Sequence, residues 1–83
     1  MKHKLLKMAN ELNELLLHSK INGYIQFYRF EDGVIAIYFT HIHKSYEHNN
    51  TSIHIYDFNN EECILEKTEK IKRVIAGEAY LNE

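Results

Sequence analysis

GYIQFYRFEDGVIAIYFTHIH, residues 23–43, is the densest run of β-branched and aromatic residues in the chain. A single Glu-Asp-Gly tripeptide divides it, and two such runs around a glycine-containing turn are typical of a β-hairpin. Gly33 can adopt the positive φ that a three-residue loop with a G1 bulge requires, which would pair Phe30 with Val34. The alternative is a two-residue turn at Asp32-Gly33, which would mix the side chains of the two faces.

The bulged register divides the side chains of the two predicted strands, Tyr24–Phe30 and Val34–His43, between two faces. The aliphatic face carries Ile25, Phe27, Ile35, Ile37 and Phe39. The opposite face carries Tyr24, Gln26, Tyr28, Phe30, Val34, Ala36, Tyr38 and Thr40. The aliphatic set is the better core, so we expect it to contact the helices.

A helix and a third strand are predicted on either side of the hairpin. Residues Lys2–Ser19 have the apolar spacing of an amphipathic helix, with an expected buried stripe of Leu5, Met8, Leu12, Leu15 and Leu16. Lys44–Thr51 is a polar loop. Ser52–Phe58 alternates Ile53 and Ile55 with polar and aromatic residues, as a strand does.

A second amphipathic helix is predicted after Phe58. Asn59 and Glu62 fit a capping box, and Phe58 with Cys63 fits the hydrophobic staple around it. Gly77 is the expected C-cap. The expected buried stripe of this helix is Ile64, Leu65, Thr68, Ile71 and Ile75. The tail beyond it is expected to fold back through Ala79, Tyr80 and Leu81.

The order helix, three antiparallel strands, helix predicts an α+β fold, a two-layer sandwich of αβββα topology with a three-stranded meander. Both helices are expected on the aliphatic face, and a three-layer arrangement with one helix on each face is the alternative. Residues 1–83 are expected to form a single small globular domain. A chain of this size buries about 60% of its unfolded surface on folding, so its free energy of unfolding should be small.

The composition argues against several classes of protein. The formal net charge of −2 gives no field that would attract nucleic acid. One cysteine cannot form an internal disulfide or a cysteine-based zinc cluster. We find no secretory signal and no apolar run of membrane-spanning length, so a cytoplasmic protein is expected. No motif requires a cofactor, and none is expected.

Six histidines raise a metal hypothesis. His41 and His43 would project from one face of a strand, and His54 on the next strand could complete a three-histidine site. That register, however, would put Ile53 and Ile55 on the face away from the other core residues. Burying a large apolar side chain is worth about 2 kcal/mol. We therefore expect the other register, no bound metal, and His41 and His43 at the solvated rim of the core.

The same histidines could act as acid and base in cleaving RNA. In element order the chain resembles HicA-type toxins, RNA-cleaving proteins with one working histidine on the sheet, which implies a catalytic role for His41 or His43. The chain departs from them because no glycine motif precedes His41 and because it is not basic. Double-stranded-RNA-binding domains share the element order but present lysines at the start of the last helix. Glu61 and Glu62 occupy that place, so RNA binding of this kind is rejected.

The aromatic face of the sheet is the surface that stands out. The rings of Tyr24, Tyr28, Phe30, Tyr38 and Tyr56 would lie there together, with Val34, Ala36, Ile42 and Phe58 and few charges. A contiguous apolar patch usually marks an interface, and tyrosine is a residue that interfaces favour. We therefore expect a non-enzymatic protein-binding module, with those five rings as the partner-binding residues.

The partner is expected to be another protein, or a second copy of the chain in a homodimer. The Asn-, Lys- and Ile-rich composition suits an AT-rich genome, and small proteins of this kind are common among phage and mobile-element inhibitors of host enzymes, including anti-defence proteins. This link is one of composition. An RNA-cleaving toxin and a purely structural homodimer are the alternatives.

Overall fold

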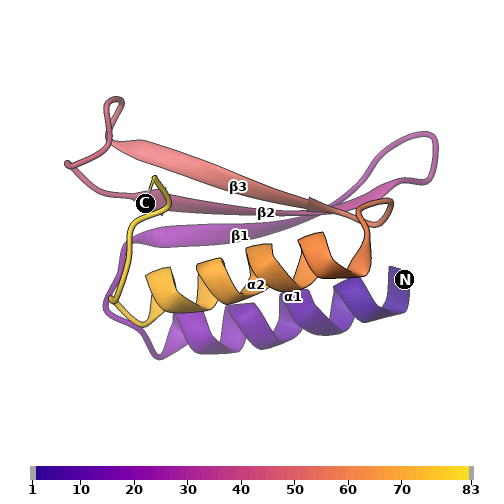
Figure 1. Cartoon of the computed structure of the whole chain (residues 1–83), viewed down its shortest axis with the longest axis horizontal. Helices are drawn as coiled ribbons and strands as arrows, with labels where there is room; N and C mark the ends of the chain where they lie inside the picture. Colours follow the sequence, from indigo (N-terminus) through magenta and orange to yellow (C-terminus); the bar gives the residue numbers. More distant parts are fainter. Residues whose placement is uncertain (1, 83) are drawn as a thin grey trace.

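The computed structural model describes residues 2–82, in the order α1 (Lys2–Leu17), β1 (Gly23–Arg29), β2 (Ile35–Ile42), β3 (Asn50–Tyr56) and α2 (Glu61–Ile75). The strands form one antiparallel sheet in the order β1-β2-β3. Both helices lie on the same side of this sheet (Figure 1). The predicted αβββα two-layer sandwich is confirmed, and the three-layer alternative is wrong.

The hairpin between β1 and β2 has the predicted G1 bulge. Gly33 has a φ of 92°, and its N–H donates to the carbonyl oxygen of Phe30 at 3.0 Å. The Phe30 N–H donates to the carbonyl oxygen of Val34 at 2.8 Å, so these two residues pair as expected. The Asp32 carboxylate accepts from the Val34 N–H at 3.0 Å and holds the turn. This register sends Ile37 and Phe39 to the helices.

The third strand continues the same alternation. Ile55 lies opposite Ile37, and Ile53 lies opposite Phe39, so the isoleucines of β3 join the core. His54 lies opposite Tyr38 on the other face of the sheet. The strand begins at Asn50, two residues earlier than predicted, because Asn49 reverses the chain with a φ of 66° and accepts the His43 N–H at 3.0 Å.

The core lies between the sheet and the two helices. It is built from Leu5, Ala9, Leu12, Ile35, Ile37, Phe39, Ile55, Ile64, Ile71, Val74 and Ile75. Three predicted members are not in it, since Leu15, Phe27 and Leu65 are 44%, 42% and 55% exposed. Phe27 is exposed because it lies on β1, at the edge of the sheet. Leu15 lies at the gap between the helices instead, and Val74 rather than Leu65 completes the buried side of α2.

The α2 cap is displaced by one residue from the prediction. Asn60 is the N-cap, and its side-chain oxygen accepts the Cys63 N–H at 2.8 Å. The Asn59 side chain accepts the Tyr56 N–H instead, so the capping box with Glu62 is wrong. The staple between Phe58 and Cys63 is wrong for the same reason, since it belongs to a cap at Asn59.

The other helix ends follow simple capping rules. Gly77, with a φ of 81°, follows α2 and allows the Glu78 N–H to reach the Arg73 carbonyl oxygen at 2.9 Å, as in a Schellman motif. The first helix ends at Leu17, two residues before the predicted end, and the Ser19 N–H and hydroxyl both donate to the Leu16 carbonyl oxygen.

Lys2 ties the start of α1 to the hairpin and to the end of β3. Its Nζ lies 2.6 Å from the Asp57 carboxylate and donates to the Gly33 carbonyl oxygen at 2.7 Å. The same carboxylate oxygen accepts the Ile35 N–H at 3.2 Å. The hydrogen bond from Lys2 lowers the pKa of Asp57. The carboxylate therefore stays charged and keeps the helix against this end of the sheet.

We predict that stability depends on the aliphatic face rather than on the tyrosines. Phe39→Ala should cost about 2–5 kcal/mol of unfolding free energy, because it leaves a cavity in the core. Tyr28→Ala should cost less, since the Tyr28 side chain is half exposed. Chemical denaturation of both variants measures the difference. The reverse order of stability would show that the rings, not the aliphatic residues, are the core.

Candidate functional site

The sheet face opposite the helices, which we call the open face, is not covered by any element of residues 2–82 (Figure 1). The antiparallel register places the even-numbered residues of all three strands on it. Among these strand positions there is no lysine, arginine, aspartate or glutamate. The strand positions of the open face therefore carry no formal charge.

Six rings form a connected group on this face, which we call the aromatic cluster: Tyr28, Phe30, Tyr38, His54, Tyr56 and Phe58. Tyr38 is at its centre, with its ring stacked on His54 at 4.0 Å between centroids and near those of Tyr28 at 6.5 Å and Tyr56 at 6.2 Å. Phe30 contacts Tyr28, and Phe58 stacks on Tyr56, with centroids 4.7 and 4.9 Å apart.

The structure brings four of the five predicted partner-binding residues into the aromatic cluster and places the fifth apart. Tyr24 lies on the open face near the start of β1, opposite Thr40, and is 47% exposed. Tyr28 is 50% exposed and Phe58 is 68% exposed, so the two ends of the cluster are open to solvent. His54 belongs to the cluster too, although the sequence pattern did not predict it as a partner-binding residue.

Hydrogen bonds link several polar side chains of the open face to one another. The hydroxyl groups of Tyr38 and Tyr56 lie 3.4 Å apart, and Tyr56 is also 3.4 Å from Nδ1 of His54. The hydrogen bond with Tyr56, followed by burial, raises the pKa of Tyr38, so its phenol stays neutral. Thr40 and Ser52 pair through their hydroxyl groups at 2.8 Å. These bonds hold the rings in place without adding charge.

A second group of rings, the histidine–tyrosine cluster, lies at one end of the core and consists of His41, His43, Tyr46 and Tyr80. The His41 and His43 rings are 5.8 Å apart, and Tyr80 lies 4.9 Å from His43 and 6.1 Å from His41. Only 4% of His41 is exposed, so the expectation that this histidine lies at a solvated rim is wrong. His43 is half-buried.

The hydroxyl group of Tyr46 joins three parts of the chain. It lies 2.7 Å from Nδ1 of His41 and accepts the Leu81 N–H at 2.9 Å. Because the Tyr46 hydroxyl oxygen accepts the Leu81 N–H, the hydroxyl group can donate its own proton in a hydrogen bond to Nδ1 of a neutral His41 ring. Burial, followed by the charge of His43, lowers the pKa of His41 and favours this neutral form. The predicted folding back of the tail is confirmed by this contact.

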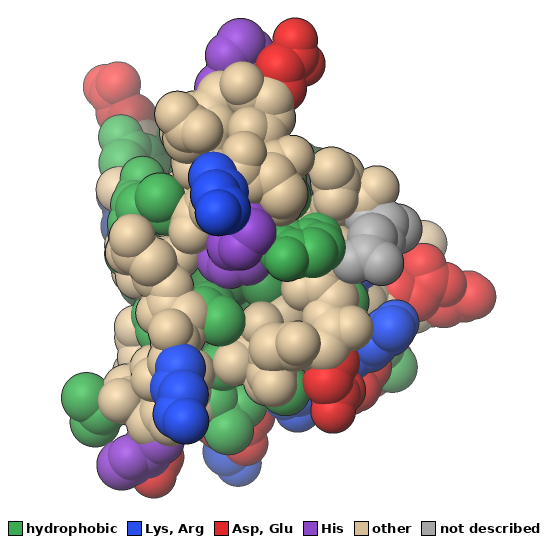
Figure 2. All heavy atoms as spheres, turned by 90° about the vertical axis from the view of Figure 1, so that its left-hand side faces the viewer, with side chains coloured by type: hydrophobic (Ala, Val, Ile, Leu, Met, Phe, Trp, Pro, Cys, Tyr) green, Lys and Arg blue, Asp and Glu red, His purple; other side chains and the backbone are tan. Residues whose placement is uncertain are grey.

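A surface pocket of about 430 Å³ adjoins the histidine–tyrosine cluster and is lined by Ile21, His41, His43, Val74, Gly77, Glu78, Ala79 and Tyr80. Figure 2 looks onto this end of the molecule and shows a histidine side chain near its centre, beside hydrophobic side chains. Sequence reasoning missed Tyr46 as a site residue. The one available signal was that it is the single aromatic residue in an otherwise polar loop.

The three-histidine metal hypothesis does not match the geometry. His41 and His43 are neighbours on the helix side of the sheet, whereas His54 stacks on Tyr38 on the open face. Within residues 2–82 we find no group of three or more His, Cys, Asp or Glu side chains arranged to hold a metal ion.

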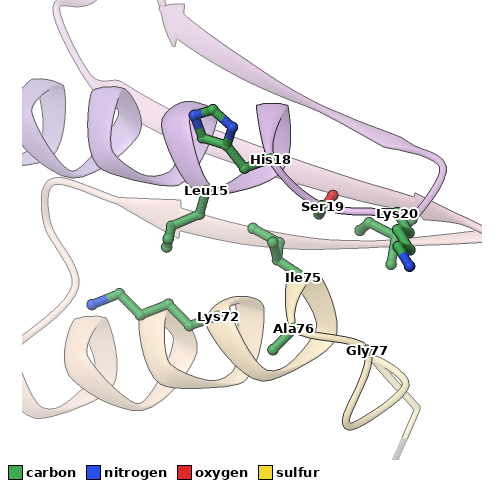
Figure 3. Close-up of a pocket in the computed structure, with 9 residues that line it drawn as sticks. Leu15, His18, Ser19, Lys20, Lys72, Ile75, Ala76 and Gly77 are labelled. Carbon is green, nitrogen blue, oxygen red and sulfur yellow. The ribbon is translucent and has the colours of Figure 1, made fainter.

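A hollow of about 490 Å³ lies between the C-terminal ends of α1 and α2 (Figure 3). Leu15 and Ile75 point into this gap from the two helices. The polar side chains do not converge on one point, since Lys72 extends along α2 while His18 lies on the α1 side. We therefore assign no ligand to this hollow.

Comparison of the chain with protein-family models, with curated proteins and with solved structures returns no significant match. Neither helix in residues 2–82 combines the length and the apolar character needed to cross a bilayer. Function must therefore be inferred from the open face and the histidine–tyrosine cluster themselves.

We predict that His41 makes stability fall as the solution becomes acidic. Its pKa is lowered in the folded state, so the unfolded chain binds the proton first as the pH drops below about 6.5. The stabilisation of the fold by neutral His41 is complete above that pH and is lost progressively below it. His41→Gln should be less stable at pH 7.5 but should lose less melting temperature between pH 7.5 and pH 5.5.

His48→Gln is the matched control, because His48 is exposed in the loop before β3. It should keep the pH dependence of the wild type. Equal pH dependence in His41→Gln and the wild type would show that burial of His41 is not linked to protonation.

Proposed function

We propose that the protein is a non-enzymatic protein-binding module whose docking surface is the open face. The observation that supports this proposal is the aromatic cluster, a connected set of partly exposed rings on a rigid sheet with no formal charge at its strand positions. Contiguous exposed apolar patches usually mark interfaces, and tyrosine supplies contact area at a low entropy cost.

The chemistry of the open face favours one class of partner. A nucleic acid would need lysine or arginine to neutralise its phosphates, and the strand positions of the face supply neither. A protein surface that is apolar and carries neutral hydrogen-bonding groups would match the rings and their hydroxyl groups. An inhibitor of a host or defence enzyme, as the composition suggested, is one form that such a module could take.

The test places a charge at the centre of the aromatic cluster. Tyr38→Glu should weaken binding to the partner by about 30-fold or more, the loss expected for a central hot-spot residue. Leu65→Glu, on the exposed side of α2, is the matched control and should bind like the wild type. Both variants and the wild type would be immobilised, and the proteins that each retains from native extracts would be compared and then titrated after purification.

Circular dichroism of each variant serves as the folding control. A partner lost from both variants equally would contradict the assignment of the open face. Unfolding of Tyr38→Glu would show that the rings are structural. Light scattering on the wild type would reveal whether two open faces bind each other instead, in which case Tyr38→Glu should dissociate the pair.

Acid–base cleavage of RNA is the second candidate function, because His41 and His43 are neighbours beside a pocket. It is the weaker candidate, since His41 is buried and its Nδ1 is already bonded to Tyr46. If this function is correct, expression of the wild type should arrest growth and degrade RNA, and His43→Ala should abolish both effects. Equal growth with the wild type and the variant would remove this candidate.

A further inference from the structure

The outer edge of β1 carries backbone groups without partners in the described chain. The Phe30 N–H bonds to Val34 and the Ile42 N–H bonds to Asn22, so the even-numbered residues of β1 are those that exchange hydrogen bonds with β2. The N–H and C=O groups of Gly23, Ile25, Phe27 and Arg29 therefore point away from the sheet. No hydrogen bond from another residue of 2–82 reaches them.

The outer edge of β3, in contrast, is blocked at its C-terminal end, at His54 and Tyr56. Lys67 donates from α2 to the His54 carbonyl oxygen at 2.7 Å. Asn59 accepts the Tyr56 N–H through its side chain at 2.8 Å and donates its own N–H to the Tyr56 carbonyl oxygen at 3.1 Å. A lysine across the edge and a turn folded over it are devices that prevent further strand pairing. β1 has neither device and contains no proline or lysine.

Exposed apolar side chains lie beside the β1 edge. The Phe27 ring is 42% exposed on the helix side of the sheet. In α1, Lys4 and Leu15 face α2, since Lys4 pairs with Glu61 and Leu15 lies at the gap between the helices. The helical repeat then places Leu6 and Leu17 on the opposite side of α1, toward β1, and they are 44% and 76% exposed.

We propose that the β1 edge binds the same edge of a second copy of the chain, in antiparallel pairing about a two-fold axis at Gln26. In this register Ile25 exchanges hydrogen bonds with Phe27 of the second copy, and Gly23 does so with Arg29. All the outward backbone groups of β1 then gain partners. Two three-stranded sheets become one continuous sheet of six strands, with the helices of both copies on one side.

We infer that the strand which pairs with β1 is the β1 of a second copy, because β1 is complementary to itself in this register. Tyr24 lies opposite Tyr28 of the second copy on the open face, and Ile25 lies opposite Phe27 on the helix side, which are favourable cross-strand pairs. Arg29 meets Gly23 rather than another arginine. The antiparallel helices would also bring Leu6 of one copy toward Leu17 of the other.

This association uses the edge of the sheet and leaves the open face free. It therefore goes beyond the proposed function and does not depend on it. The dimer would join two aromatic clusters into one longer surface, so each copy could still bind a partner.

The first experiment compares two substitutions of Phe27 by sedimentation velocity over a range of concentrations. Phe27→Ala and Phe27→Pro both remove the exposed ring, but only proline removes the outward N–H and blocks strand pairing. The wild type, of 9.9 kDa per chain, should sediment as a concentration-dependent dimer. Phe27→Ala should still dimerise, and Phe27→Pro should be monomeric while circular dichroism shows it folded.

The second experiment tests the register and does not require the proline variant to fold. Gln26 would face Gln26 of the second copy on the axis, so Gln26→Glu alone and Gln26→Lys alone should each weaken the dimer about two- to fivefold. Mixing the two variants should restore association, because opposite charges then face each other. Ser52→Glu, at an exposed position on the outer edge of β3, should leave the dimer unchanged.

A wild type that remains monomeric at millimolar concentration would overturn the proposal. So would equal dimerisation of Phe27→Pro and Phe27→Ala. If Tyr38→Glu dissociates the dimer and Phe27→Pro does not, the copies meet through their open faces rather than through the β1 edge. Loss of partner binding in Tyr38→Glu with the dimer intact would leave both the edge proposal and the proposed function standing.

Discussion

The positive φ of Gly33 controls which side chains the sheet presents on each face. Because the bulge pairs Phe30 with Val34, every later residue of β2 falls into a fixed parity with β1. A slip of one residue would exchange Ile37 and Phe39 for Tyr38 and Thr40 against the helices. The faces on which the side chains of β1 and β2 lie follow from this one turn, and the β2–β3 register then places His54 on the face away from His41.

The fold could be predicted from the sequence because its main signals are local and agree with one another. The glycine of the turn, the alternation along β1 and β2, and the need to bury the isoleucines of β3 with them all favour the same register. The errors lie where neighbouring residues offer equivalent chemistry. Asn59 and Asn60 can both cap a helix, and the choice depends on how β3 ends, since Asn59 is used to accept the Tyr56 N–H. Leu65 and Val74 likewise flank the buried stripe of α2 on opposite sides, and only the packed arrangement shows which flank is buried.

The candidate site divides in the same way. The rings of the open face follow from strand parity, so the sequence alone is enough to place them together. The histidine–tyrosine cluster could not be predicted in this way, because it depends on the path of the tail. Tyr46 and Leu81 are 35 positions apart, and no periodicity connects a polar loop to a segment beyond the last helix. His41 was expected at a solvated rim because the pattern of β2 does not show which segments cover the C-terminal end of that strand.

The Tyr46 hydroxyl also has a kinetic consequence. The hairpin closes through three residues, whereas the contact between Tyr46 and Leu81 requires β2, the loop and α2 to be in place first. A contact that closes a long segment of chain costs more conformational entropy than a local one and forms after the local contacts. This end of the molecule should therefore be among the last parts to fold. By the same reasoning it should be among the first to open in the native state, at a free energy below that of global unfolding. The amide hydrogen of Leu81 would then exchange with solvent when the tail alone is released. The amide hydrogens of β2 would exchange only when the whole domain unfolds.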